Sequence, residues 1–329
     1  MKRWMGLLEW VNNTEVLKDF VEREYKEIRD PKGDLFVQNK SYEARVKFLN
    51  TLSAEKDRIQ MHKPLLTCDE RQIVANLKKC EFLMPYGMLR RALERLSKNY
   101  DSYLHLKNRF ISNFAVASVV CYLLGIGDRH LENFLVHVPT ATIILIDFGY
   151  SFGASLDLPL PELVPFRLTK IFRELMDPIG VNGNFKASMV HSIFALRSKW
   201  HQLIDFCDVF VNDPVLDWAY MARKKRVIRT VIGVGGNTMS QEVEQDQSFF
   251  KKKIEYVQNK LHGRNPRLLL SQALGDSKHK DVPGLRKMVE GNKQLKPLVS
   301  ATEQVELLIE LATDKNILGR AFTPWCPYV

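Results

Sequence analysis

The sequence predicts an α+β fold that is mostly helical and holds one short β-hairpin. Residues Phe110 to Leu124 are apolar on nearly every side and end just before Gly125, which is typical of a buried helix with a glycine C-cap. The next two runs, FLVHV and TIILIDF, are rich in β-forming residues and are separated by Pro-Thr-Ala at residues 139–141, which predicts a hairpin. The loop between helix and hairpin is therefore held at both ends by rigid apolar elements, where functional polar residues usually lie.

The bulk composition is that of an ordinary soluble globular protein. The 329 residues can bury one large core or two modest ones, and the net charge of +10 suits an acidic partner such as a nucleotide or nucleic acid, or simply a solvated surface. The five cysteines are scattered and odd in number, which favours reduced thiols over a disulfide framework or a zinc site. No apolar run has transmembrane length, and the first residues lack the apolar core of a signal peptide.

The remaining chain is predicted to be helices joined by loops. Asn-Asn-Thr at residues 12–14 is expected to cap a helix from Glu15 to Ile28, and residues 31–34 read as a turn. Residues 262–300 are expected to be loop and linker, and a capping box at Ser300 starts a C-terminal helix. The other predicted helices are Glu70–Lys78, Met88–Ser97, Thr169–Leu175, Ser188–Trp200 and Leu203–Val211.

Three polar residues mark the loop and the hairpin as a candidate active site. Asp128 and Asn133 are five residues apart on the loop, and Asp147-Phe-Gly follows the second strand. Protein kinases have the same layout of a catalytic Asp, a metal-holding Asn and a DFG Asp. These hard oxygen ligands suit Mg²⁺ bound to phosphates. Either motif alone is explained equally well by an Asx-turn or a cap, but their joint occurrence at this spacing indicates phosphotransfer.

The order Asp-Arg-His at residues 128–130 narrows the choice of kinase family, because most protein kinases have the reverse order, His-Arg-Asp. The run GIGDRHLEN followed by IDFG resembles the phosphatidylinositol 3-kinase-related protein kinases. This resemblance implies a protein-kinase-like C-lobe of the PI3/PI4-kinase type, with a catalytic β-hairpin and a C-terminal FATC segment. Four flanking segments resemble the DNA-dependent branch of the family, from about the first residue to the last: Gly6–Trp10, Val164–Thr169, Asp208–Val211 and Asn316–Arg320.

The resemblance implies a role for each matching position of the loop. Asp128 would be the catalytic base, and His130 would hydrogen-bond the transferring phosphate. Asn133 and Asp147 would hold Mg²⁺. Arg129 is expected to pin the loop by ion pairing rather than to touch the substrate.

The resemblance also implies an adenine pocket. Trp10 would line this pocket, and the backbone of the next residue, Val11, would bond the adenine edge. From the residues alone, a strand that packs Trp10 in a core is the simpler interpretation. Leu135 and Ile146, on the two strands of the hairpin, are candidates for the pocket floor, although core residues would look identical in sequence.

Four parts are implied along the chain: a hinge segment at 1–11, a kinase C-lobe at 12–220, a helical and linker extension at 221–300, and FATC at 301–329. Because the hinge stands at the start of the sequence, the N-lobe is expected to be missing. The FATC segment should pack against the activation loop, while a loose amphipathic tail that binds a membrane or a partner is the alternative.

The extension carries two basic clusters and a glycine cluster. The basic clusters, Arg223–Arg226 and Lys251–Lys253, suit DNA contact, a nuclear address signal or a solvated helix face. The glycine cluster Gly233–Gly236 reads as a turn.

Residues 150–169 correspond to the activation loop, and Tyr150 to Glu162 contain no Lys or Arg. Lipid kinases of the superfamily carry a basic patch here, so a protein substrate is expected, with Gln after the phosphorylated Ser or Thr. The resemblance further implies ATP and Mg²⁺ as cofactors, a nuclear location, and double-strand break repair by non-homologous end joining with DNA ends and the Ku heterodimer. The alternatives are a phosphoinositide lipid kinase and an inactive, N-lobe-less fragment that acts as a binding module.

Overall fold

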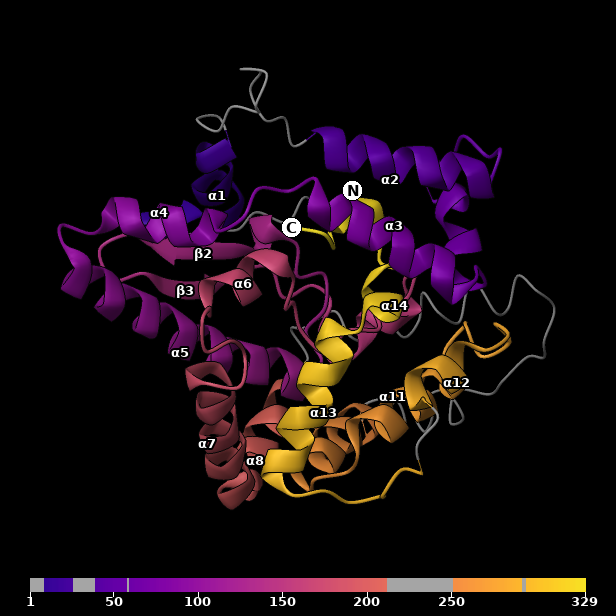
Figure 1. Ribbon diagram of the computed structural model, residues 1–329. Helices are drawn as coiled ribbons and strands as arrows, with labels where there is room; N and C mark the ends of the chain where they lie inside the picture. Colours follow the sequence, from indigo (N-terminus) through magenta and orange to yellow (C-terminus); the bar gives the residue numbers. More distant parts are fainter. Residues whose placement is uncertain (1–8, 26–38, 58, 212–250, 292–293) are drawn as a thin grey trace, which may run out of the picture.

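The computed structural model describes residues 9–25, 39–57, 59–211, 251–291 and 294–329, and it confirms the α+β, mostly helical fold (Figure 1). Among these residues, no helix is long and apolar enough to cross a membrane. Residues 251–261 are also helical. The named helices are α1 Leu17–Tyr25, α2 Asn39–Leu52, α3 Glu70–Phe82, α4 Met88–Leu96, α5 Tyr100–Leu124, α6 Lys170–Leu175, α7 Asn184–Ser198, α8 Trp200–Val211, α11 Pro266–Asp276, α12 Leu285–Glu290, α13 Ala301–Thr313 and α14 Lys315–Leu318.

Helix α5 is the central element, and it confirms the predicted buried helix and its glycine C-cap. Gly125 adopts the left-handed conformation just after the last turn, with φ of 58°. The helix begins ten residues before the apolar run, at Tyr100. The reason is a capping box in which Asn99 and Ser102 exchange side chain–backbone hydrogen bonds, so a polar first turn still starts a stable helix.

The predicted hairpin is confirmed and gains a third strand. Strands β1 Thr14–Val16, β2 Phe134–His137 and β3 Thr142–Leu145 form an antiparallel sheet in the order β1-β2-β3. The expected helix from Glu15 was therefore wrong at its start. Asn13 has a positive φ of 56°, and its carbonyl accepts a 2.9 Å hydrogen bond from the N–H of Val138. The chain is thus bound to the hairpin before the helix can begin.

Sheet alternation separates two faces of the hairpin. Phe134 and Val136 lie on the face that packs against α5, where the N–H of Ile143 also donates to the side chain of Asn113 over 2.6 Å. Leu135 lies between them in sequence and therefore points to the opposite face. Figure 1 shows the hairpin lying along α5 with α6 close by.

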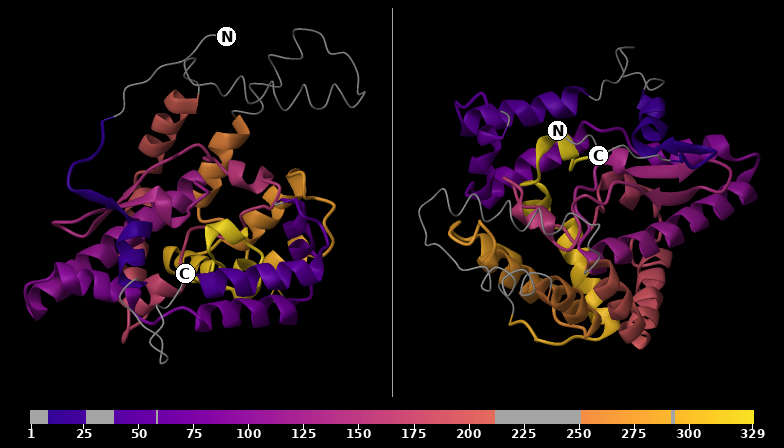
Figure 2. Two further views of the ribbon diagram at one scale, coloured as in Figure 1. Left: turned by 90° about the horizontal axis from the view of Figure 1, so that it is seen from above. Right: turned by 180° about the vertical axis from the view of Figure 1, so that it is seen from behind.

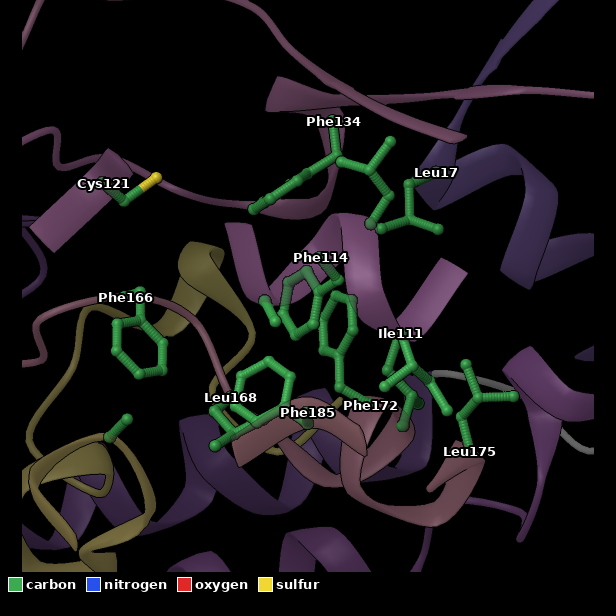
Figure 3. Close-up of a cluster of buried hydrophobic side chains, with 14 of the residues drawn as sticks. Leu17, Ile111, Phe114, Cys121, Phe134, Phe166, Leu168, Phe172, Leu175 and Phe185 are labelled. Atoms are coloured by element: carbon green, nitrogen blue, oxygen red, sulfur yellow. The ribbon is translucent and has the colours of Figure 1, made fainter. Parts of the chain in front are cut away.

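Stacked aromatic rings fix the hairpin to the helices below it (Figure 3). Phe114 of α5 stacks on Phe172 of α6 with ring centroids 4.2 Å apart and planes 6° apart. Phe185 of α7 lies 5.6 Å from Phe114, and Phe134 of β2 lies 6.3 Å from Phe172. All four rings are almost completely buried, so this cluster holds the sheet and three helices in one rigid body.

The C-terminal segment packs into the body of the protein, and the loose-tail alternative was wrong. Ser300 forms the predicted capping box at the start of α13, which runs beside α7. Tyr328 and Val329 are each only 1% exposed. Both views of Figure 2 show this segment passing through the interior toward α2 and α3.

Three buried arginines hold this segment through backbone carbonyls. Arg45 of α2 donates to the carbonyls of Gly319 at 2.5 Å and Ala321 at 3.2 Å. Arg320 donates to the carbonyls of Leu65 and Cys68. The third, Arg167, is described with the site. Burial lowers the pKa of Arg45 to about 10, which still leaves the guanidinium charged at neutral pH.

The expectation of loop and linker at 262–300 was wrong, because α11 and α12 lie there. The side chain of Asn265 caps α11 by accepting a hydrogen bond from the N–H of Arg267, and Pro266 occupies its first turn. Both are recognised helix-start signals. Of the basic clusters, residues 251–253 lie within the helical stretch described at 251–261. Residues 223–226, the glycine cluster at 233–236 and the turn at 31–34 lie outside the described residues.

Arg45→Ala should loosen the C-terminal segment. The change leaves buried carbonyls without a hydrogen-bond donor. We therefore expect the free energy of local opening of residues 315–329 to fall by about 3 kcal/mol, which corresponds to roughly a hundredfold faster amide exchange. Hydrogen–deuterium exchange measured by mass spectrometry reports this. Lys47→Ala, an exposed position on the same helix, is the matched control. Equal exchange in both variants would show that Arg45 does not anchor the segment.

Candidate functional site

The loop that follows α5 runs close against the start of the activation loop. The N–H of Gly127 donates to the carbonyl of Tyr150 at 2.8 Å, and the N–H of Gly153 donates to the carbonyl of Gly125 at 2.9 Å. A Cβ at Gly125 would lie 2.5 Å from the nitrogen of Gly153, and one at Gly127 would lie 2.7 Å from Glu162 Oε2. The two glycines therefore allow the two loops to touch.

Arg129 ties the loop that follows α5 to the Asp-Phe-Gly segment at residues 147–149. Its side chain is 1% exposed and donates to the carbonyls of Gly127 at 2.9 Å and Ile146 at 2.8 Å, with further hydrogen bonds to those of Asn133 and Asp147. In the described part of the chain the contacts are thus to backbone oxygens, and the expected ion pairing was wrong. A guanidinium suits this task because its five N–H groups diverge in one plane.

Asn133 is oriented with its oxygen free. Its amide nitrogen Nδ2 donates to the carbonyl of Asp128 at 2.7 Å, and the side chain is buried. Within the described residues, Oδ1 accepts no hydrogen bond. This orientation leaves the oxygen, which is the atom that a hard cation needs, as the available end of the amide.

Asp147 is exposed and lies directly after the residue paired with Asn133. The N–H of Ile146 donates to the carbonyl of Asn133 at 3.2 Å, and Asp147 Oδ1 accepts from the N–H of Gly149 at 3.1 Å. Asp128 and Asp147 both have left-handed backbones, with φ of 58° and 56°. Left-handed non-glycine residues are strained and concentrate at functional sites.

The oxygen atoms of Asn133 and Asp147 are of the chemical type that binds Mg²⁺. Among the described residues, no group of three or more His, Cys, Asp or Glu could hold a metal ion. A full protein cage is not required, because Mg²⁺ is commonly held by one or two side-chain oxygens together with waters and phosphates. Asn133 Oδ1 and the Asp147 carboxylate meet that requirement.

His130 lies at the edge of the site in a charged surface cluster. Its Nδ1 is 3.9 Å from Glu132 Oε2, while Glu132 Oε1 accepts a 2.5 Å hydrogen bond from Lys18 of α1. This hydrogen bond lowers the pKa of Glu132 and raises that of Lys18. Lys18 was missed in the sequence, since nothing local connects it to a residue more than a hundred positions away.

The proposed adenine-binding residues are distributed along the sheet. Leu135 and Ile146 share the face opposite the helical core, because Leu135 pairs with Ile144 and Ile146 is two residues further along. Leu135 is only 1% exposed and Ile146 is half-buried. Trp10 and Val11 are 52% and 45% exposed and precede β1, where the hydroxyl of Thr14 donates to the carbonyl of Val11. Trp10 is therefore not a core residue.

Sequence reasoning missed two residues of the activation loop. Glu162 accepts a hydrogen bond from the backbone N–H of Asp128, and burial raises the pKa of its carboxyl to about 7. Arg167 donates to the carbonyls of Arg129, Trp325 and Cys326, and its guanidinium lies 4.3 Å from the Trp325 ring. A lone charge within an apolar run, as in LPLPELVPF, is the one signal in the sequence that could have indicated a carboxylate with a polar partner.

Comparison with known proteins agrees with this geometry. The profile of the family described as phosphatidylinositol 3- and 4-kinase matches residues 1–220. The chain belongs to the phosphatidylinositol 3- and 4-kinase family. The profile of the FATC domain matches residues 299–329, the segment that Arg167 joins to the catalytic loop.

The relatives of this family member include large protein kinases. The chain is 32% identical to the DNA-dependent protein kinase catalytic subunit of Xenopus laevis, over 99% of the chain and 8% of the relative, and the Mus musculus protein gives the same figures. The target of rapamycin homolog of Caenorhabditis elegans is 27% identical over 98% of the chain and 11% of the relative. The chain thus spans about a tenth of the length of these curated relatives.

A solved structure supports the kinase-family fold independently. The FAT and kinase domain of CtTel1 superposes with a TM-score of 0.64 and 19% sequence identity, covering 97% of this chain and 18% of that chain. At this identity the likeness concerns the fold.

Arg129→Lys should loosen both loops of this kinase-family site although it preserves the charge. One ammonium group cannot reach carbonyls that surround a planar guanidinium, so we expect a loss of about 2–3 kcal/mol in local stability and at least tenfold faster amide exchange over residues 126–133 and 145–150. Arg90→Lys, at an exposed pair with Glu94, is the control. Unchanged exchange in Arg129→Lys would contradict the organising role.

Proposed function

We propose that this chain is the catalytic part of a serine/threonine protein kinase that transfers the γ-phosphate of ATP with the help of Mg²⁺. The observation that carries the proposal is the joint fixation of Asp128, Asn133 and Asp147 around one buried guanidinium, with the Asn133 oxygen and the Asp147 carboxylate left available. Such a site needs little covalent chemistry from the protein, because phosphoryl transfer is catalysed mainly by positioning and charge stabilisation.

Each side chain then has a definite task. Asp128 orients the attacking hydroxyl and accepts its proton. His130 donates a hydrogen bond to the phosphoryl oxygens, where negative charge develops. Asn133 Oδ1 and the Asp147 carboxylate hold the metal ion, which when bound neutralises charge on the phosphates.

The adenine is proposed to lie along the sheet face that carries Leu135 and Ile146, with Trp10 and Val11 at its far edge. Two observations support this. Trp10 and Val11 precede Asn13, whose carbonyl bonds the N–H of Val138 next to the hairpin turn, and the strand from Asn133 to His137 spans about 13 Å. A nucleoside triphosphate is elongated, with its base and its phosphates at opposite ends, and it fits between these two ends of the sheet.

A protein substrate is proposed rather than a lipid. The segment from Tyr150 to Glu162 contains no Lys or Arg that would bind an inositol phosphate. The relatives in the previous section include protein kinases named for DNA dependence. We extend their properties to this chain as proposals: Ser/Thr-Gln sites, action in the nucleus, and break repair by non-homologous end joining with DNA ends and the Ku heterodimer.

The test is Asp147→Asn in the intact protein that contains this chain. The change removes the charge that holds the metal, so phosphorylation of a Ser-Gln peptide should fall at least about a thousandfold while the fold is kept. Asp205→Asn, an exposed site on α8, is the control. The readout is radiolabelled phosphate transfer at varied Mg²⁺ concentration.

Substrate panels separate the alternatives. A Ser-Gln peptide, a Ser-Ala peptide and phosphatidylinositol vesicles are offered to the same preparation. Phosphorylation of the vesicles but of neither peptide would establish a lipid kinase. Equal inactivity of the native protein and Asp147→Asn, with nucleotide binding absent in both, would establish a non-enzymatic binding module.

A further inference from the structure

Glu162 reaches from the activation loop to the backbone of the catalytic residue. Its Oε2 accepts a hydrogen bond from the backbone N–H of Asp128. The backbone of Glu162 is itself fixed, because its N–H donates to the carbonyl of Ser155 at 3.3 Å. A side chain of the activation loop thus holds the backbone amide of Asp128.

The surrounding chain is shaped to accept this carboxylate. Gly127 directly precedes this amide, and a Cβ there would lie 2.7 Å from Glu162 Oε2. Asp128 has a left-handed backbone, which costs on the order of 1 kcal/mol or more for a non-glycine residue and persists only where neighbours enforce it. The Glu162 carboxylate, which accepts a hydrogen bond from the N–H of Asp128, helps to hold this left-handed conformation.

The carboxylate is held where its charged form is disfavoured. It lines a small cavity of about 50 Å³ behind the catalytic loop, and burial raises the pKa of Glu162 from 4.5 to about 7. The contribution of this group to stability is therefore fully present below pH 4.5 and is lost as the pH rises through about 7. At higher pH the ionised Glu162 therefore makes the fold less stable.

We propose that Glu162 is a positioning residue that sets the backbone of Asp128 for phosphoryl transfer. The inference rests on the proposed function and extends it to a residue outside the catalytic loop. The N–H of Asp128 points at the carboxylate, so a charged acceptor at this position holds the catalytic loop most firmly. Protonation of Glu162, or its replacement by Gln, removes the negative charge and leaves a neutral, weaker acceptor.

Several charged and titratable groups face the same cavity or contact Glu162, and none replaces it. Asp128 disfavours the charged form of Glu162, whereas Arg129 favours it. The ammonium of Lys260 is turned to the carbonyls of Tyr122 and Leu123. The other titratable groups that line the cavity are the phenols of Tyr122 and Tyr256, whose pKa values burial raises.

Glu174 provides a matched control within the same fold. It is a half-buried carboxylate on α6 that accepts a 3.0 Å hydrogen bond from the backbone N–H of Gly87 and pairs with Lys170 at 3.3 Å, and burial raises its pKa as well. It differs from Glu162 in lying away from the catalytic loop. A loss specific to Glu162 variants therefore reports positioning rather than the general cost of altering a buried carboxylate.

The experiment compares Glu162→Gln, Glu162→Ala and Glu174→Gln in the intact kinase. We expect kcat to fall about tenfold in Glu162→Gln and about a hundredfold in Glu162→Ala, with the KM for ATP within about threefold of the native value. Amide exchange over residues 126–133 should accelerate in both. Glu174→Gln should change neither quantity.

The pH profile gives a readout that a structural role would not move. In the native protein and Glu174→Gln, kcat should decline as the pH falls through about 7, where Glu162 takes up its proton. In Glu162→Gln the decline of kcat should move to lower pH. At pH 8 the unfolding temperature of this variant should equal or exceed that of the native protein.

The outcomes separate this inference from the proposed function. Native phosphotransfer with native kcat, pH profile and exchange in both Glu162 variants would overturn the positioning role alone. If the native protein does not transfer phosphate, the proposed function fails. In that case exchange over residues 126–133 still decides whether Glu162 holds the loop, and unchanged exchange in Glu162→Ala would reject it.

Discussion

The site depends on one buried guanidinium. Arg129 is the middle residue of Asp-Arg-His, yet its hydrogen bonds reach the far side of the hairpin, to the carbonyls of Ile146 and Asp147. Two loops that are separated by a strand, a turn and a second strand are thereby fixed to one planar group. A buried cation of this kind is acceptable because its donors are matched by carbonyl oxygens, which replace the lost water.

A second buried guanidinium that bonds backbone carbonyls connects the loop that carries Arg129 to the C-terminal segment. Arg167 bonds the carbonyl of Arg129 on one side and those of Trp325 and Cys326 on the other. Arg45 and Arg320 repeat the pattern further along the segment. Guanidinium groups that bond backbone oxygens fix the course of the chain whatever the neighbouring side chains are. The position of the catalytic loop is therefore coupled mechanically to the packing of the last residues.

Local patterns in the sequence predicted what is determined locally. Helix α5, its Gly125 cap and the β2–β3 hairpin follow from apolar runs and breakers, and the motif spacing pointed to the loop before the hairpin and to Asp147 after it. The three-residue strand β1 was missed because its partner is more than a hundred residues away. The acceptors of Arg45 and Arg167, and the reach of Glu162, depend on tertiary contacts that no window of sequence contains. The start of α11 was missed even though Asn265-Pro266 is a local signal.

A left-handed backbone alone does not distinguish this site from the rest of the chain. What distinguishes it is the combination of a left-handed backbone with charged groups removed from water. Asn13 and Ala141 also have left-handed backbones, but each lies at a turn beside the sheet, where such a conformation simply reverses the chain. Asp128 instead lies between a carboxylate disfavoured by burial and a guanidinium deprived of water. Each of these features is unfavourable by itself, and the stacked Phe114–Phe172 core supplies the stability that lets them coexist. A strained backbone, a buried guanidinium and a carboxylate whose charge is disfavoured thus meet at the loop that carries Asp128, which is the physical argument for treating this loop as a functional site.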